Sequence, residues 1–243
     1  MTYFSFYLIN TGALIIFVDN LGHPHQIVLL ISMIIFSVFS FIIQKFFIFS
    51  TANQRWPMLN FNKPFIVEKS FSNIRDAVSK FNISGDGIFT KKCHEFFKKK
   101  YGFKNNFLTP SCTAALEMIA LLIDIKPGDE IIMPTFTFVS CANAFVLRGA
   151  KIRFVDSNKN EPNIDVSKIE ALVNKNTKAV LVVHYAGIPC DINALLKLKK
   201  KHSLILIEDC AHAIDSYYKK KPLGSFGDFS TFSFHDTKNI TCG

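Results

Sequence analysis

Two residues near the end of the chain, Asp209 and Lys238, have side chains and spacing suited to covalent catalysis. Asp209 ends an apolar run at residues 204–209, which is the pattern of a buried parallel strand, and such a strand ends at the ligand-binding edge of an α/β sheet. Lys238 follows a second apolar run at 231–234, so we expect a later strand to bring its amine to the same edge. An amine that binds an aldehyde and an acid that keeps a ring nitrogen protonated are what pyridoxal phosphate (PLP) requires.

The pair alone does not establish a site, because a lysine after a strand is often only a solvated loop residue. Five motifs accompany it: LTPSCTAALEM at 108–118, PTFTF at 134–138, VHYAG at 183–187, EDCAHA at 208–213 and FSFHDTKN at 232–239. In order and spacing they resemble the DegT/DnrJ-type sugar aminotransferases, from about Phe61 to the last residue. With GDGIFT at 85–90, the wording is most similar to the dTDP-4-amino-4,6-dideoxygalactose transaminases of that family.

The resemblance implies an α/β fold, the large domain of a fold type I PLP-dependent transferase with a mainly parallel sheet. It implies that Lys238 binds the cofactor aldehyde and then moves a proton, while Asp209 pairs with the ring nitrogen. Members that dehydrate have histidine at the lysine position, so lysine here indicates transamination. The implied substrates are glutamate as amino donor and a keto nucleotide sugar, with the 4-keto-6-deoxy type favoured over a 3-keto sugar. The implied assembly is a homodimer that serves the synthesis of cell-surface polysaccharide such as lipopolysaccharide.

Five further residues of the motifs are candidates for cofactor binding. A helix is expected to start near Cys112 and Thr113, where unpaired N–H groups could hold the phosphate. Without the resemblance, Thr113 is equally well a plain helix cap. The resemblance implies that Ser233 adds a hydroxyl to the phosphate, that Phe138 stacks on the ring and that His212 lies near the ring's phenolic oxygen. A core phenylalanine and a structural histidine are the alternatives for the last two.

Composition argues against several other classes of protein. The formal net charge is +9, but the lysines are scattered or lie in solvated runs such as 197–201, without a nucleic-acid recognition motif. The six cysteines show no Cys-x-x-Cys spacing and no matching histidines, which argues against a zinc site or a disulfide framework. No Gly-x-Gly-x-x-Gly follows a strand, which argues against a nicotinamide-dependent sugar oxidoreductase. We therefore expect neither a metal nor a nucleic-acid partner.

The first 50 residues differ from the rest, because Asp19 and Lys45 are their only charged residues. Residues 27–43 are seventeen positions without a charge or a proline, long enough to span a bilayer at about 1.5 Å per residue. With the shorter apolar stretch 3–18, they indicate a transmembrane helical hairpin. The alternatives are a cleaved signal peptide, which would have a basic start, and a buried hairpin, which would keep a polar face.

Residues 40–49 are similar to the closing helix of the GtrA-like family of small membrane proteins, so the hairpin would be a partial GtrA-like unit. Four basic residues follow its second span: Lys45, Arg55, Lys63 and Lys69. Cationic flanks stay on the cytoplasmic side of a membrane. We therefore expect anchoring in the inner membrane by residues 1–50, a linker at 51–60 and a cytoplasmic aminotransferase domain at 61–243.

The chain stops at Gly243, five residues after Lys238, whereas the resemblance implies a further, smaller C-terminal domain. We therefore expect the domain at 61–243 to be truncated at its C-terminus. The alternative function is an inactive, membrane-anchored remnant of a sugar aminotransferase fusion.

Helices and strands alternate between the motifs, which predicts a mainly parallel sheet. Helices are predicted at 71–81, 91–100, 114–123, 139–147, 166–173 and 192–201. Strands are predicted at 130–133, 151–155 and 179–184, in addition to the apolar runs before Asp209 and Lys238.

Overall fold

The computed structural model describes residues 63–81 and 83–242, together with three isolated residues, 18, 31 and 38. Its α-helices are α3 (Glu68–Ser79), α4 (Ile88–Tyr101), α5 (Cys112–Leu122), α6 (Val139–Val146) and α7 (Ile192–His202). Its strands are β1 (Glu130–Pro134), β2 (Lys151–Val155), β3 (Thr177–Val183), β4 (Ile205–Asp209), β5 (Tyr217–Tyr218), β6 (Lys221–Pro222) and β7 (Phe229–Thr231).

The chain divides into two units, Met1–Asn60 and Phe61–Gly243, and all of these elements belong to the second. Apart from the three isolated residues, the hairpin expected at 1–50 and the linker expected at 51–60 lie outside the described residues. Within the described part of the chain, no helix is both long enough and apolar enough to cross a bilayer.

Five strands form one sheet in the order β2-β1-β3-β4-β7, and every neighbouring pair is parallel. The chain passes from β1 to β2 through α6, and from β3 to β4 through α7. Parallel strands joined by helical crossovers place their carboxyl ends at one edge of the sheet. The predicted parallel sheet is confirmed, and its carboxyl edge is where a site is expected.

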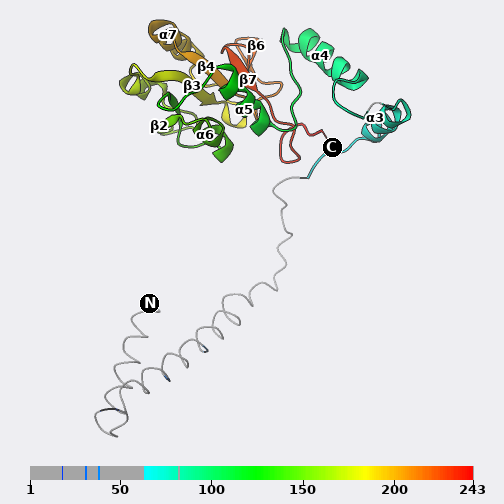
Figure 1. Ribbon diagram of the computed structural model, residues 1–243, viewed down its shortest axis with the longest axis horizontal. Coiled ribbons are helices and arrows are strands. Elements are labelled where there is room, and N and C mark those ends of the chain that lie inside the picture. The colour runs from blue at the N-terminus through cyan, green and yellow to red at the C-terminus, as the bar shows by residue number, and fades with distance from the viewer. Residues whose placement is uncertain (1–17, 19–30, 32–37, 39–62, 82, 243) are drawn as a thin grey trace. The chain divides into compact units, whose positions relative to one another are not determined.

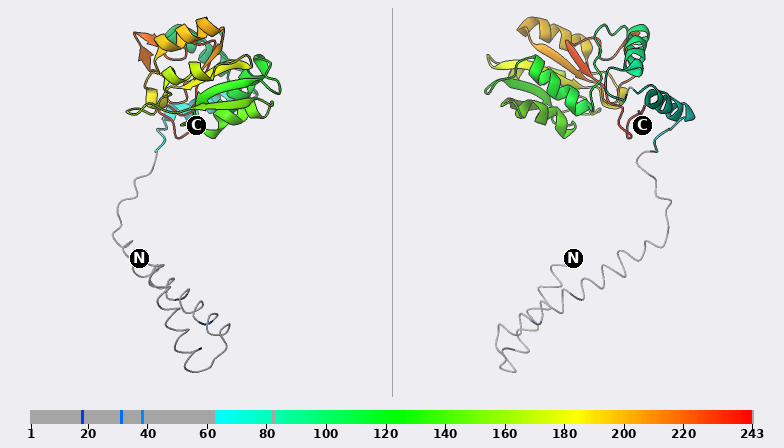
Figure 2. Two further views of the ribbon diagram at one scale, coloured as in Figure 1. Left: turned by 90° about the vertical axis from the view of Figure 1, so that its left-hand side faces the viewer. Right: turned by 45° about the vertical axis from the view of Figure 1, so that its right-hand side comes forward.

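Helices cover both faces of the sheet and make three layers (Figure 1). α5 and α6 pack on one face together with Ile131 and Met133 of β1. The other face packs Ile132 of β1 against α7, and Figure 2 shows the layers from two further sides. Because successive residues of a strand face opposite ways, a strand covered on both faces has to be apolar throughout, as the centre of β1 is.

Aromatic side chains connect α4 and the loop after it to the last segment of the domain. The ring centroids of Phe97 and Phe234 are 6.0 Å apart, and those of Phe103 and Phe232 are 5.4 Å apart. Phe232 and Phe234 flank Ser233 in the segment that follows β7. These contacts therefore hold the path of the chain toward Lys238.

The helix predicted at 166–173 is wrong, because this segment forms two 3₁₀ turns, Val166–Lys168 and Glu170–Leu172. Asp165 caps the first turn by accepting a backbone N–H on its side chain. The segment also places Ile169 in the core, fully buried. β-branched residues are weak helix formers, and two short turns bury the same apolar positions that suggested a helix.

The last strand also differs from the prediction. β7 ends at Thr231, so the apolar run at 231–234 begins where the strand stops. Ser233 and Lys238 consequently lie in the segment beyond β7, and Lys238 is not at a strand end.

Candidate active site

A buried carboxylate lies at the carboxyl edge of the sheet, where the sequence predicts an acid. Asp209 is the last residue of β4 and is 4% exposed. Its Oδ1 accepts the N–H of Ala211 at 2.9 Å, and its Oδ2 accepts the thiol of Cys141 at 2.9 Å. Hydrogen bonds on both oxygens fix the plane of the carboxylate. Asp209 is therefore a rigid, negatively charged group at the edge.

Lys238 reaches the same edge from the segment after β7. Its Nζ is 3.0 Å from Nε2 of His212, which lies three residues after Asp209. The following residue, Asn239, donates from Nδ2 to the carbonyl of Ile214 at 3.3 Å. Burial lowers the pKa of His212 below its usual 6.5, and the charge of Lys238 lowers it further. The imidazole is therefore neutral at pH 7 beside the amine.

The N-terminus of α5 offers unpaired backbone donors to this edge. Ser111 is its cap, because its Oγ accepts the N–H of Ala114 at 3.0 Å. The interpretation of Thr113 as a plain cap is therefore wrong, and its hydroxyl instead donates to Oγ of Ser140 at 2.8 Å. The N–H groups of Cys112 and Thr113 have no hydrogen-bond partner among the residues that the structure describes. These donors and the positive end of the helix suit an anion.

The side chains at the end of β7 lie between the acid and the helix. Thr231 is paired in register with Asp209, and its buried Oγ1 has no hydrogen-bond partner with good geometry in the described residues, although the thiol of Cys112 lies near it. Ser233, also buried, accepts the N–H of His235 at 3.4 Å and can still donate its hydroxyl proton. Two hydroxyls thus accompany the helix N-terminus.

The charges of Asp209 and Lys238 both act on the thiol of Cys112. Burial raises the pKa of its thiol to about 11, the charge of Asp209 raises it as well, and the charge of Lys238 opposes the rise. Cys112, at the start of α5, is therefore within electrostatic reach of both groups. Asp209, Lys238, His212 and Cys112 therefore lie near one another at this edge, and the roles that the resemblance implies for them stay predictions.

Phe138 lies at this edge, but its ring pairs with no other aromatic ring in the part of the chain that the structure describes. It is the residue before α6 and is 71% exposed, so the alternative of a core phenylalanine is wrong. The packed rings here are Phe136 and Tyr185, with centroids 4.9 Å apart, and Tyr185 also stands edge-on to His212 at 5.1 Å. The stacking role of Phe138 stays a prediction.

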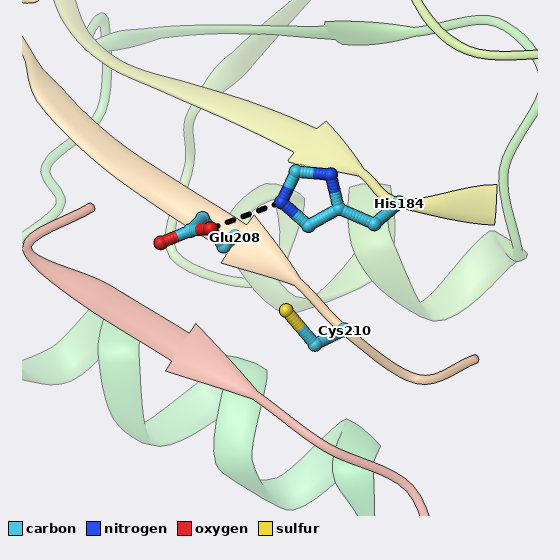
Figure 3. A group of neighbouring side chains, drawn as sticks. All are labelled: His184, Glu208 and Cys210. Carbon is cyan, nitrogen blue, oxygen red and sulfur yellow. Dashed lines mark hydrogen bonds and ion pairs between the residues drawn. The ribbon is translucent and has the colours of Figure 1, made fainter. Parts of the chain in front are cut away.

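A second group of polar side chains lies deeper, at the ends of β3 and β4. Figure 3 shows His184 turned toward Glu208 of β4, with Cys210 just after the end of β4. The nitrogen, oxygen and sulfur atoms of these three side chains that could bind a metal lie within 4.8 Å of one another. Nδ1 of His184 accepts the N–H of Cys190 at 3.2 Å, so its proton is on Nε2, 3.0 Å from Oε2 of Glu208. Burial raises the pKa of Cys210 well above its ordinary value. A side chain binds a metal ion through a deprotonated atom with a free lone pair. Here both ring nitrogens of His184 are used in hydrogen bonds, and the thiol of Cys210 keeps its proton.

Glu208 uses both carboxylate oxygens to hold the loop that precedes β7. Oε2 accepts the N–H of Gly224 at 2.9 Å, and Oε1 accepts those of Phe226 at 2.7 Å and Gly227 at 2.5 Å. Burial would raise the pKa of Glu208, but the hydrogen bonds from His184 and from these amides outweigh it and lower the pKa. Glu208 is thus a buried anion that braces the sheet.

Comparison with known proteins identifies the family and its fold. Residues 64–243 match the DegT/DnrJ/EryC1/StrS aminotransferase family. The chain belongs to this family. It is 36% identical to GDP-perosamine synthase of Escherichia coli O157:H7 over 181 residues, which cover 74% of this chain and 50% of that protein. It is 42% identical to the spore coat polysaccharide biosynthesis protein SpsC of Bacillus subtilis strain 168 over 151 residues, which cover 60% and 39%.

Solved structures of such aminotransferases share the fold. A candidate sugar aminotransferase of Streptococcus pneumoniae, Spr1654, in its PLP form, matches with a TM-score of 0.67 and 30% identity, covering 75% of this chain and 50% of that one. The PLP-type aminotransferase fold predicted from the sequence is therefore confirmed. The chain spans about half the length, or less, of the curated relatives named here.

The residues at the carboxyl edge fit each polar part of PLP. The N–H groups of Cys112 and Thr113 suit its phosphate, the Asp209 carboxylate suits its ring nitrogen, and the Lys238 amine suits its aldehyde. The donor set therefore fits the cofactor of the family.

Sequence analysis did not single out Tyr185 or Cys141. Tyr185 lies within the VHYAG motif, so the motif itself was the available signal. Cys141 carries no local signal, because its partner Asp209 is 68 positions away and the two meet only in the folded domain.

Proposed function

We propose that this chain is the cofactor-binding part of a PLP-dependent aminotransferase that transfers an amino group from glutamate to a keto nucleotide sugar. The observation that carries the proposal is that Asp209, at the end of β4, and Lys238, with its Nζ 3.0 Å from Nε2 of His212, reach the same edge of the sheet as the start of α5. A GDP-perosamine synthase and a spore coat polysaccharide protein among the relatives support a sugar acceptor and polysaccharide synthesis. The wording of the motifs favours the 4-keto-6-deoxy type of sugar.

PLP, when bound, supplies an aldehyde for amines and a ring that withdraws electrons from them. Lys238 would hold this aldehyde through Nζ, and its free amine would move the proton at the donor's Cα. Nε2 of the neutral His212 lies 3.0 Å from Nζ and would hold the amine in place. Asp209, which is buried, would hold the ring nitrogen of the cofactor protonated, in a place where such an interaction is strong.

Binding of the phosphate is a separate task of the chain. The N–H groups of Cys112 and Thr113 point out of α5 without partners in the described chain, and Ser233 adds a hydroxyl from the segment after β7. An anion at a helix N-terminus is stabilised by these donors and by the helix dipole. These donors would anchor the cofactor at the start of α5, at the same edge of the sheet as Asp209 and Lys238.

Covalent labelling tests the proposal directly. The purified full chain is mixed with PLP, reduced with borohydride, digested and analysed by mass spectrometry. We expect the label on Lys238, its loss in Lys238→Ala, and its retention in the control Lys200→Ala, which changes an exposed lysine of α7. A label elsewhere, or none, would contradict the proposal and favour the inactive remnant.

We also infer that residues 1–50 anchor the chain in the inner membrane, with the aminotransferase domain in the cytosol, because only Asp19 and Lys45 are charged among them. Each buried CH₂ group contributes about 0.8 kcal/mol to leaving water. Fractionation of the full chain and of a version beginning at Asn60 tests this. Sedimentation of the full chain with membranes and solubility of the shorter one are expected, and a soluble full chain would contradict it. A homodimer, implied by the resemblance, is tested on the shorter version by light scattering.

A further inference from the structure

A buried thiol touches the catalytic carboxylate. Cys141, in the first turn of α6, is 1% exposed. Its Sγ is 2.9 Å from Oδ2 of Asp209 and 3.0 Å from Oγ1 of Thr137. Thr137 lies in the loop between β1 and α6, so a chain of two hydrogen bonds runs from that loop to the end of β4.

The direction of these hydrogen bonds follows from the groups themselves. An ionised carboxylate only accepts, so the thiol of Cys141 donates to Asp209, and the hydroxyl of Thr137 donates to the sulfur. Burial raises the pKa of Cys141, and the charge of Asp209 raises it further. The sulfur therefore keeps its proton at neutral pH and remains a donor.

The two oxygens of Asp209 are held from two separate elements. Ala211 holds Oδ1 from the turn directly after β4, whereas Cys141 holds Oδ2 from α6 across the layer boundary. Without the second donor, the carboxylate could rotate about its Cβ–Cγ bond. We propose that Cys141 is a positioning residue, oriented by Thr137, that fixes the Asp209 carboxylate for the ring nitrogen of PLP. This inference rests on the proposed function.

Other titratable groups also face Asp209, so a pH profile alone would not isolate the thiol. They are Cys112 on α5, Cys210 and His212 after β4, and Lys238 after β7. The charge of Asp209 shifts the pKa of Cys112, Cys210 and His212, and the charge of Lys238 shifts that of Cys112 and His212. The test therefore compares variants at one pH and reads PLP affinity.

The experiment titrates the cofactor-free full chain with PLP and follows the change in absorbance. We expect Cys141→Ala to weaken the affinity roughly tenfold, the scale of one hydrogen bond to a charged group, and Cys141→Ser to restore it to within about twofold. Thr137→Val should weaken it in the same direction by a smaller factor. In an Asp209→Asn background, Cys141→Ala should change the affinity by less than about twofold, because the thiol acts through the carboxylate.

Cys190→Ala is the matched control. It also removes a buried thiol, 3% exposed, which donates to the carbonyl of Val183 at 3.2 Å and lies in the core on the other face of the sheet. Cys190→Ala should lower stability without changing PLP affinity. Equal weakening by Cys141→Ala and Cys141→Ser, or the same effect with and without Asp209, would overturn the role of Cys141 alone. Failure of the unsubstituted chain to bind PLP would overturn the proposed function and this inference with it.

Discussion

Replacement of Glu208 by glutamine is the sharpest test of how the site is supported. Its carboxylate is fully buried and accepts four hydrogen bonds, from His184 and from three backbone amides. In Glu208→Gln, Oε1 can still accept from Phe226 and Gly227, but an NH₂ group stands where Oε2 was. That group faces two donors, the N–H of Gly224 and Nε2–H of His184, which lose their acceptor.

The loss can be estimated from these contacts. A hydrogen bond to a charged group contributes about 1.5–3 kcal/mol, so two of them amount to about 3–6 kcal/mol. Removal of a buried charge offsets part of this, which places the expected loss near 3 kcal/mol. For a domain of this size, that lowers Tm by roughly 6–12 °C. Urea unfolding and thermal melting, followed by circular dichroism, measure both quantities.

The control is Glu117→Gln, the same substitution at an exposed position of α5, which should leave Tm unchanged. The pH dependence supplies a second check. Because the folded pKa of Glu208 is below its usual 4.5, the unfolded chain binds more protons between the two values. The stabilisation is therefore complete above about pH 4.5 and is lost as pH falls through the folded pKa. The difference between Glu208→Gln and the unsubstituted chain should shrink below about pH 4.5, and a difference under about 1 kcal/mol at pH 7 would refute the reasoning.

Three further predictions concern the edge of the sheet and its loops. Asp209→Asn should still bind PLP, with an affinity at least as weak as that of Cys141→Ala, and should remove most of the transamination rate, since an amide cannot hold the ring nitrogen protonated; steady-state kinetics with unchanged kcat would contradict this. Ser111→Ala removes the cap of α5 and should lower the free energy of unfolding by about 1 kcal/mol, measured in urea. Gly227→Ala brings a Cβ to 2.6 Å from the carbonyl oxygen of Leu206 and should destabilise by about 1–3 kcal/mol, whereas the control Gly85→Ala meets nothing within 4 Å and should be tolerated.

The strands of the sheet were predictable because burial on two faces leaves a simple pattern. Ile131, Ile132 and Met133 are all fully buried, so β1 reads as a continuous apolar run bounded by polar and proline residues. β4 reads in the same way and ends in its acid. Short elements without such burial could not be predicted.

The hairpin of β5 and β6 shows why. Its turn residues, Lys219 and Lys220, have positive φ angles of 48° and 65°, a conformation usually signalled by glycine or asparagine. Two lysines carry no such signal. Instead, the structure around the turn stabilises it, with Tyr218 accepting a hydrogen bond from Asn193 at 3.0 Å.

The residues of the candidate site also differ in how far the sequence could predict their positions. Asp209 could be placed from its strand. The resemblance implied that Lys238 and His212 both lie near the cofactor, but the contact between the two was not predicted. β7 ends seven positions before Lys238. The path of the chain between them depends on packing against Phe97 and Phe103, which are distant in the sequence. The thiol of Cys141 lay beyond both approaches, because its role arises from a contact between α6 and β4.

Glu208 and Asp209 are adjacent in β4 but have different partners, because successive side chains of a strand point to opposite faces of the sheet. Leu206 packs in the core with α7 and Ile207 in the core with α5 and α6. Glu208 therefore shares the face of Leu206 and accepts hydrogen bonds from the loop before β7, whereas Asp209 shares the face of Ile207 and meets α6. A shift of β4 by one residue would exchange the two carboxylates and leave each without its donors. Glu208 and Asp209 thus require the same register of β4, and Glu208 also holds the loop through which the chain continues to Lys238.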